Sequence, residues 1–178
     1  MLQILNRENQ SRTFWVLFAF TIVVIIGMQL TGGPLKTDAA PGGIVTFEII
    51  GTLEGSLDII NSWQGQSMTW AGINMGLDFL FIVLYSLTLA MACRLIADKF
   101  VHPLIKQSGI WLARAVFLAA MLDVIENIAL IKLLTGSQSE FLPILARWCA
   151  LPKFFLIILA LIYVILGIYP AMIRPTKN

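Results

Sequence analysis

Charged residues are scarce in this chain. Asp, Glu, Lys and Arg make up 12% of its 178 residues, whereas 58% are hydrophobic. A typical soluble domain has about 25% charged residues. So few charges cannot keep a whole protein surface in water, and we expect most of that surface to face lipid. The net charge is only +2 and no basic run occurs, which excludes the usual electrostatic surface of a nucleic-acid-binding protein.

Residues that carry metal and redox chemistry are also rare. The single histidine, His102, and the two cysteines, Cys93 and Cys149, are too few for a His-rich or Cys-rich metal centre. The sequence contains no CxxC, GxSxG or P-loop pattern and no visible internal repeat. No cofactor is therefore evident from the sequence.

Long apolar runs dominate what is present, and a helix that crosses a bilayer needs roughly 17–25 such residues. The sequence predicts an all-α membrane protein with a four-transmembrane-helix bundle as one domain over 1–178. The predicted transmembrane helices lie at about 14–30, 71–93, 110–134 and 151–169.

The first and the last predicted spans each leave a question open. A Gly-Gly-Pro turn and Thr37–Ala40 follow the first run, as they would follow a cleaved signal peptide. The hydrophobic core of a signal peptide usually has about 7–15 residues. The 17 residues of this run exceed that length, which favours a retained helix. Pro143 and Pro152 interrupt the last apolar block. We therefore expect 141–149 to lie at the membrane interface or to form a kinked start to the fourth helix.

An amphipathic helix is predicted at about 44–63, on the outer side between the first two spans. Glu54 and Asp58 lie along one edge of its apolar stripe, and Glu48 falls on the far side. The helix either lies on the membrane surface with solvated charges or covers the bundle as a lid with Glu54 and Asp58 at its mouth. The stripe has helical spacing and consists of Ile50, Leu53, Leu57 and Ile60.

The basic residues predict the orientation. Seven of them lie near the two termini and in the loop after the second span, whereas four fall on the opposite side: Lys36, Lys132, Arg147 and Lys153. The positive-inside rule places both termini in the cytoplasm. Cys93 and Cys149 then lie at opposite faces of a bilayer core about 30 Å thick, too far apart for a disulfide.

Acidic residues inside the spans give the candidate site. Asp123, Glu126 and Asn127 lie close together on the third predicted helix, and carboxyls at membrane depth are usually functional. On the second helix, one stripe carries Asn74, Asp78 and Tyr85 at a comparable depth. Antiparallel packing of the two helices would bring Asn74, Asp78, Glu126 and Asn127 together in the outer half of the bundle, with Tyr85 nearer Asp123. A bound metal, if there is one, would use the carboxyls of Asp78, Asp123 and Glu126.

No cation in the sequence evidently neutralises these acids. Arg114 is nine residues from Asp123 and on the opposite side of the helix. Buried acids without a cation must be protonated, bind a cation or be reached by water. The simplest alternative to a ligand site is a network of hydrogen bonds between helices. Three acids and two amides at one depth favour a cavity that is either filled with water or binds a ligand.

Three motifs resemble a family of small bacterial four-span membrane proteins. They are Gly43–Glu48, Leu77–Phe81 with Tyr85, and Leu122–Asn127, and the resemblance covers about residues 43 to 134. It implies the four-span architecture and a multi-pass location in the bacterial inner membrane. The family has no established activity, so no residue role follows from it.

These observations favour a membrane protein that binds a small amphiphilic or cationic ligand, such as a lipid-like molecule or a cation. The expected ligand-binding residues are Asn74, Asp78, Tyr85, Asp123, Glu126, Asn127, Glu54 and Asp58. An intramembrane enzyme acting on lipid through paired carboxyls is a second hypothesis, for which no nucleophile or metal-ligand motif is found. A third is an accessory or assembly subunit of a membrane complex, whose acids pair with Lys or Arg of another chain. A cation-coupled transporter would need several copies of the chain to form a pathway.

Overall fold

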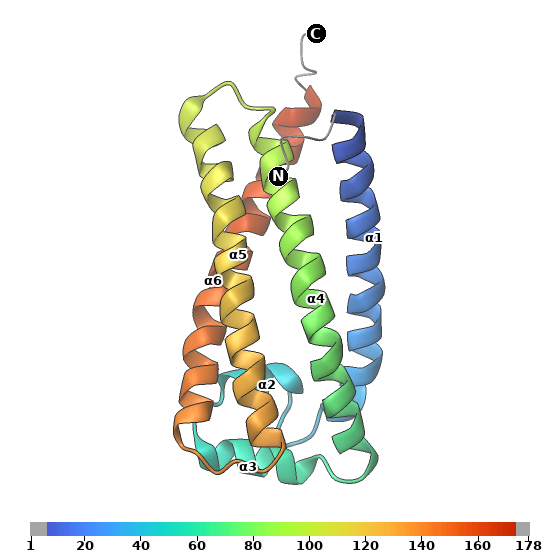
Figure 1. The fold of residues 1–178 in the computed structure, drawn as a ribbon, viewed down its shortest axis with the longest axis vertical. Coiled ribbons are helices and arrows are strands. Elements are labelled where there is room, and N and C mark those ends of the chain that lie inside the picture. Colours follow the sequence, from blue (N-terminus) through green and yellow to red (C-terminus); the bar gives the residue numbers. More distant parts are fainter. Residues whose placement is uncertain (1–6, 174–178) are drawn as a thin grey trace.

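The computed structural model describes residues 7–173, and helices are the only regular secondary structure in that range. Four long helices alternate in direction (Figure 1), with two short helices and a 3-10 turn inserted between the first two. In chain order the elements are α1 (Arg7–Gly32), η2 (Gly33–Leu35), α2 (Ile44–Ile49), α3 (Leu53–Ser62), α4 (Gln66–Ala97), α5 (Pro103–Leu134) and α6 (Phe141–Ile173).

The long helices pack side by side in a single bundle (Figure 1). α5 packs against both α4 and α6, whereas α1 packs chiefly on α4. The start of α1 and the end of α6 lie at one end of the bundle, and α2 and α3 cover the other end. Hydrogen bonds also tie α1 to α4, because Thr21 Oγ1 and Thr88 Oγ1 are 3.0 Å apart in the buried contact.

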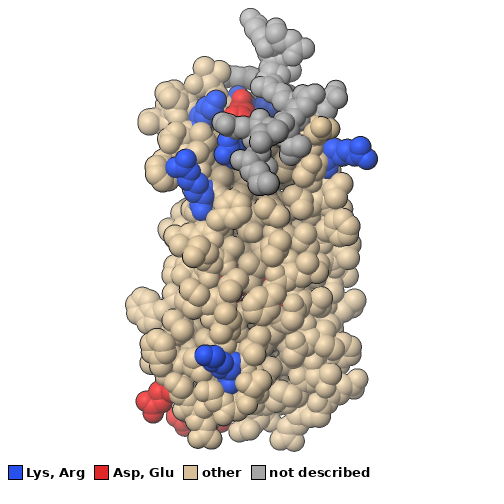
Figure 2. Space-filling model, in the orientation of Figure 1, with Lys and Arg blue, Asp and Glu red and all other residues tan. Residues whose placement is uncertain are grey.

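Among the described residues, three helices are long and apolar enough to cross a membrane, over Asn9–Leu35, Gln66–Ala97 and Phe141–Ile168. On the face drawn in Figure 2, charged side chains gather toward the two ends of the bundle and the band between them is uncharged. This distribution is compatible with a membrane protein. α5 has a similar length but is not among the three.

The last helix begins earlier than the predicted fourth span. α6 is continuous from Phe141, so the residues expected to lie at the interface or in a kinked start belong to the same helix as the rest. Pro143 lies in the first turn, where the missing N–H is not needed, and Pro152 lies in the interior. Prolines are tolerated within apolar helices that pack against neighbouring helices.

The single helix expected at 44–63 is two short helices instead. The chain turns at Gly51, whose φ is +72°, a conformation that favours glycine. A Cβ there would lie 2.6 Å from Arg147 Cδ, so the side chain of Arg147 also fills the space beside the turn. Thr52 Oγ1 then accepts a hydrogen bond from the Gly55 N–H and caps the start of α3. The break gives α2 an axis of its own.

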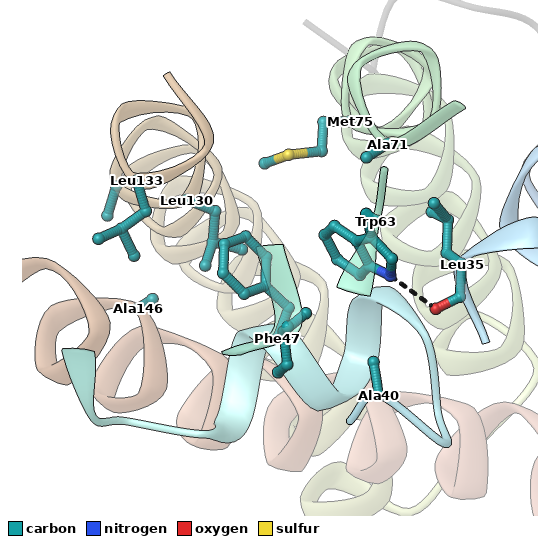
Figure 3. Close-up of a cluster of buried hydrophobic side chains, with 11 residues drawn as sticks. Leu35, Ala40, Phe47, Trp63, Ala71, Met75, Leu130, Leu133 and Ala146 are labelled. Carbon is teal, nitrogen blue, oxygen red and sulfur yellow. Dashed lines mark hydrogen bonds between the residues drawn. The ribbon is translucent and has the colours of Figure 1, made fainter. Parts of the chain in front are cut away.

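A compact apolar core joins the short helices to this end of the bundle (Figure 3). Phe47 of α2 and Trp63 are fully buried and pack edge to face, with ring centroids 5.3 Å apart. The Trp63 indole N–H donates a 2.8 Å hydrogen bond to the carbonyl oxygen of Leu35. The long helices contribute Ala71, Met75, Leu130, Leu133 and Ala146.

Removing Trp63 should therefore loosen this end of the bundle. We expect Trp63→Ala to lower the free energy of unfolding by about 3–5 kcal/mol, because it deletes a fully buried ring. Trp63→Phe, which keeps a ring but loses the hydrogen bond, should cost less. Trp148→Ala, at an exposed position, is the matched control. Unfolding by dodecyl sulfate in mixed micelles, followed by circular dichroism, measures all three; equal losses for Trp63→Ala and Trp148→Ala would contradict this.

Candidate functional site

A lysine in the interior of α6 stands at the centre of the site. Lys153 Nζ lies 2.7 Å from Asp123 Oδ1, 2.8 Å from Glu126 Oε1 and 3.6 Å from Glu48 Oε2. The first two contacts are hydrogen-bonded ion pairs to α5, and the third reaches α2. Lys153 is only 4% exposed and Glu126 is fully buried. One ammonium group therefore connects three helices.

Helix geometry explains why these groups meet. Asp123 and Glu126 are three residues apart, so they share one face of α5. Asp123 lies 11 residues before the end of α5, and Lys153 lies 12 residues after the start of α6. At 1.5 Å per residue both are about 17 Å from the turn that joins the antiparallel helices, so they lie at the same height. The separate axis of α2 adds Glu48.

α4 contributes a neighbouring set of contacts. The Tyr85 hydroxyl donates a 3.0 Å hydrogen bond to Asp123 Oδ2, the oxygen that Lys153 does not bind. The Asn127 amide donates a hydrogen bond to Asp78 Oδ2. These contacts join α4 to α5. We call the seven residues together the acidic cluster: Glu48, Asp78, Tyr85, Asp123, Glu126, Asn127 and Lys153.

The acidic cluster holds more acid than base. The cluster contains four carboxyls and one ammonium group, which contacts three of them, and no other Lys, Arg or His in the described range forms an ion pair with these acids. Glu48 Oε2 and Glu126 Oε2 are also buried without a hydrogen-bond partner. So many carboxylates cannot all stay ionised in a buried site. The cluster must hold protons or accept a further cation.

Glu48 lies outside the long helices, and its pKa shows the effect of this excess of acids. Burial raises its pKa from the ordinary 4.5 to about 7, the ammonium of Lys153 acts in the opposite direction, and the carboxylates of Asp78 and Asp123 raise it further. Glu48 therefore changes charge near neutral pH. Its side chain is 6% exposed.

A small pocket opens beside Glu48. Its volume is about 160 Å³, and it lies between the end of α1, the segment that follows, α2 and α4. Glu48 is shared, because it lines the pocket and also contacts Lys153. We call this space the Glu48 pocket; its lining residues are Met28, Gln29, Gly32, Lys36, Gly42, Ile44, Val45, Glu48 and Asn74.

The structure brings together five of the residues that the sequence predicted as a site: Asp78, Tyr85, Asp123, Glu126 and Asn127. Three others lie elsewhere. The Asn74 amide donates to Met28 O at 2.8 Å and Thr31 Oγ1 at 2.7 Å, so it holds α1 and lines the Glu48 pocket. Glu54 and Asp58 are exposed on α3 and take no part in the acidic cluster. Whether these residues bind a ligand stays a prediction.

The expectation that no cation neutralises the acids was wrong. Lys153 was assigned to the membrane edge because the fourth span was started at residue 151, whereas α6 begins at Phe141 and carries Lys153 well inside. The lone lysine in the apolar run 141–168 was the signal that could have identified it. Glu48 was missed because a single helix over 44–63 points it away from the bundle. With Lys153 in place, pairing of Asp123 and Glu126 does not require another chain.

The proposed use of Asp78, Asp123 and Glu126 as metal ligands finds no geometric support. Within residues 7–173, no three His, Cys, Asp or Glu side chains converge as a metal site would require. Asp78 is bonded to Asn127, and the other two carboxyls point to Lys153.

Comparison with known proteins adds no relative: no protein-family model, curated protein or solved structure matches the chain. The resemblance to small four-span bacterial proteins therefore stays an expectation. The acidic cluster and the Glu48 pocket are what bear on function.

Removing Lys153 should strongly destabilise the protein. Lys153→Met would leave Asp123 and Glu126 without their cation, and breaking a buried ion pair in this way costs about 3–5 kcal/mol. The exposed Lys132→Met is the matched control and should change the free energy of unfolding by less than about 0.5 kcal/mol. Adding Asp123→Asn and Glu126→Gln to Lys153→Met should recover part of the loss. Dodecyl sulfate unfolding tests this, and similar stabilities for the two lysine variants would contradict it.

Glu48 should also make stability depend on pH. Between about 4.5 and 7 the folded protein holds the Glu48 proton more tightly than the unfolded chain. The free energy of unfolding should therefore fall as pH rises through this window, by up to about 1.4 kcal/mol per pH unit from this group. Glu48→Gln should remove this contribution, so its stability relative to wild type should improve from pH 5 to pH 8. Parallel profiles for the two proteins would show that Glu48 does not titrate there.

Proposed function

We propose that the chain is an integral membrane protein in which α1, α4, α5 and α6 all cross the bilayer. α5 has 32 residues, as α4 has, and packs between α4 and α6. Its carboxyls at Asp123 and Glu126 point to Lys153 instead of lipid, which lowers the penalty of charges at membrane depth. The bundle end with Arg94, Lys99 and Lys106 faces the cytoplasm under the positive-inside rule. The resemblance noted above favours a bacterial inner membrane.

The function that the site supports best is the binding of a small amphiphilic or cationic ligand through the acidic cluster, by way of the Glu48 pocket. The observation that carries this proposal is Glu48 itself. It is 6% exposed, its Oε2 accepts no hydrogen bond, and it lines a pocket while contacting Lys153. An ionised carboxylate in such a place needs cations close by, and Glu48 shares its nearby cation, Lys153, with Asp123 and Glu126.

The charge balance supports the same proposal. Lys153 supplies one positive charge for four carboxyls, so a second cation at Glu48 would reduce the remaining excess. Apolar side chains form much of the rest of the pocket wall, including Met28, Ile44 and Val45. An ammonium group with an apolar tail combines the two properties that these walls would contact.

A second candidate function is an intramembrane enzyme. A carboxyl with a pKa near 7, as Glu48 has, can both accept and donate a proton at neutral pH, which suits general acid–base catalysis. The sequence shows no nucleophile motif to accompany it, so ligand binding is the simpler proposal.

An alkylammonium probe tests the binding proposal. We expect decylammonium to raise the melting temperature of the protein in maltoside micelles, more than uncharged decanol does. Affinity should rise from pH 6 to pH 8, because Glu48 loses its proton in this range while the amine keeps its own. Glu48→Gln should weaken binding about tenfold, the effect of losing one charge-assisted contact.

Two further variants sharpen the experiment. Glu54→Gln changes an exposed acid outside the pocket and should bind decylammonium as wild type does. Val45→Trp keeps every charge but adds a large side chain to the pocket wall, and it should weaken binding. Equal affinity of wild type, Glu48→Gln and Val45→Trp for decylammonium would refute the proposal.

A further inference from the structure

Building on the proposed binding function, we infer that the Glu48 pocket recognises a zwitterionic phosphoethanolamine group, the head group of an amine-bearing phospholipid. Its ammonium group would lie against Glu48 and Asn74, and its phosphate against Lys36. The pocket places these opposite charges together: Glu48 and Lys36 both line it.

Lys36 is the residue that distinguishes this ligand from a simple cation. It is exposed, and its ammonium group forms no ion pair or hydrogen bond within the described part of the chain. Its stem lies against Gly43, where an added Cβ would be 3.7 Å from Lys36 Cγ. A free ammonium beside the pocket repels a ligand that carries only positive charge. It stabilises one that also carries a phosphate.

The hydrogen-bond acceptors for the amine are on Glu48 and Asn74, which are more buried than Lys36. Glu48 lines the pocket, and its Oε2 contacts Lys153 at 3.6 Å without accepting a hydrogen bond from it. Asn74 uses its amide nitrogen to donate to Met28 O and Thr31 Oγ1, which leaves its Oδ1 without a donor among the residues described. A primary ammonium has three N–H donors and can bond to both side chains. A trimethylammonium group has none and is larger, so the pocket should discriminate against it.

The position and size of the pocket fit a head group and exclude a whole lipid. About 160 Å³ accommodates a small polar group only. The pocket lies where the apolar run of α1 ends, at residues 28 to 36, which is the level of lipid head groups for a helix that crosses the bilayer. Val45, which lines the pocket, is itself exposed. Acyl chains would remain in the bilayer along this face.

Binding of short-chain lipids tests the inference. Dihexanoyl phosphatidylethanolamine, phosphatidylcholine and phosphatidylglycerol, together with free O-phosphoethanolamine, would be titrated against the purified protein in maltoside micelles at pH 8. We expect phosphatidylethanolamine to bind about tenfold more tightly than the other two lipids, because only it has both an N–H-bearing ammonium and a phosphate.

The variants assign the two charges. Lys36→Met should weaken phosphatidylethanolamine binding about tenfold while leaving decylammonium binding unchanged or improved, because only the lipid has a phosphate. Glu48→Gln should weaken both ligands. Lys132→Met, which changes an exposed lysine outside the pocket, should alter neither.

The outcomes separate the inference from the proposed function. Glu48-dependent decylammonium binding combined with no preference for phosphatidylethanolamine, or with no effect of Lys36→Met, would overturn the inference alone. No Glu48-dependent binding of either ligand would overturn both. Equally tight binding of free O-phosphoethanolamine would support the head-group chemistry and assign it to a soluble compound, whereas tighter binding of the lipid would assign it to the membrane.

Discussion

The ion pairs of Lys153 hold the described structure together at the level where its polar groups lie. Through them α6 contacts two carboxyls of α5 and one of α2. In the proposed membrane-spanning bundle such contacts would also fix the rotation of each helix, because a turned helix would leave a charge in lipid. The contact with Glu48 further ties the short helices to the bundle, beside the apolar core around Phe47 and Trp63.

The same ion pairs explain why the acidic cluster could still bind a further cation. Asp123 and Glu126 receive direct hydrogen bonds from Lys153, whereas Glu48 is 3.6 Å away and receives none at Oε2. Glu48 therefore keeps capacity for another cation. It is also the acid that the Glu48 pocket reaches. A structural element and a candidate binding site thus share one side chain.

The sequence allowed the acids to be found but not their cation. The meeting of Asp123 with Tyr85 follows from helical spacing and matched depth, which need only the order of residues. The position of Lys153 inside the bundle depends on where α6 begins, and two prolines made that start hard to predict from the sequence. The direction of the Glu48 side chain depends on the turn at Gly51, and the left-handed conformation of this one residue makes the turn. Apolar runs thus locate long helices, whereas a single backbone angle can redirect a charged side chain.

In the proposed four-span arrangement, the pairing of α5 with α6 bears on how the protein would enter a membrane. Each helix alone would carry a charged group into lipid, at about 2.5–3.5 kcal/mol per charge on insertion scales. Only a short turn separates Leu134 from Phe141, so the two helices can meet as soon as both have been made. Insertion as a hairpin lets Lys153 and its carboxylates neutralise one another before either faces hydrocarbon. Biogenesis would then treat the last two spans as one unit.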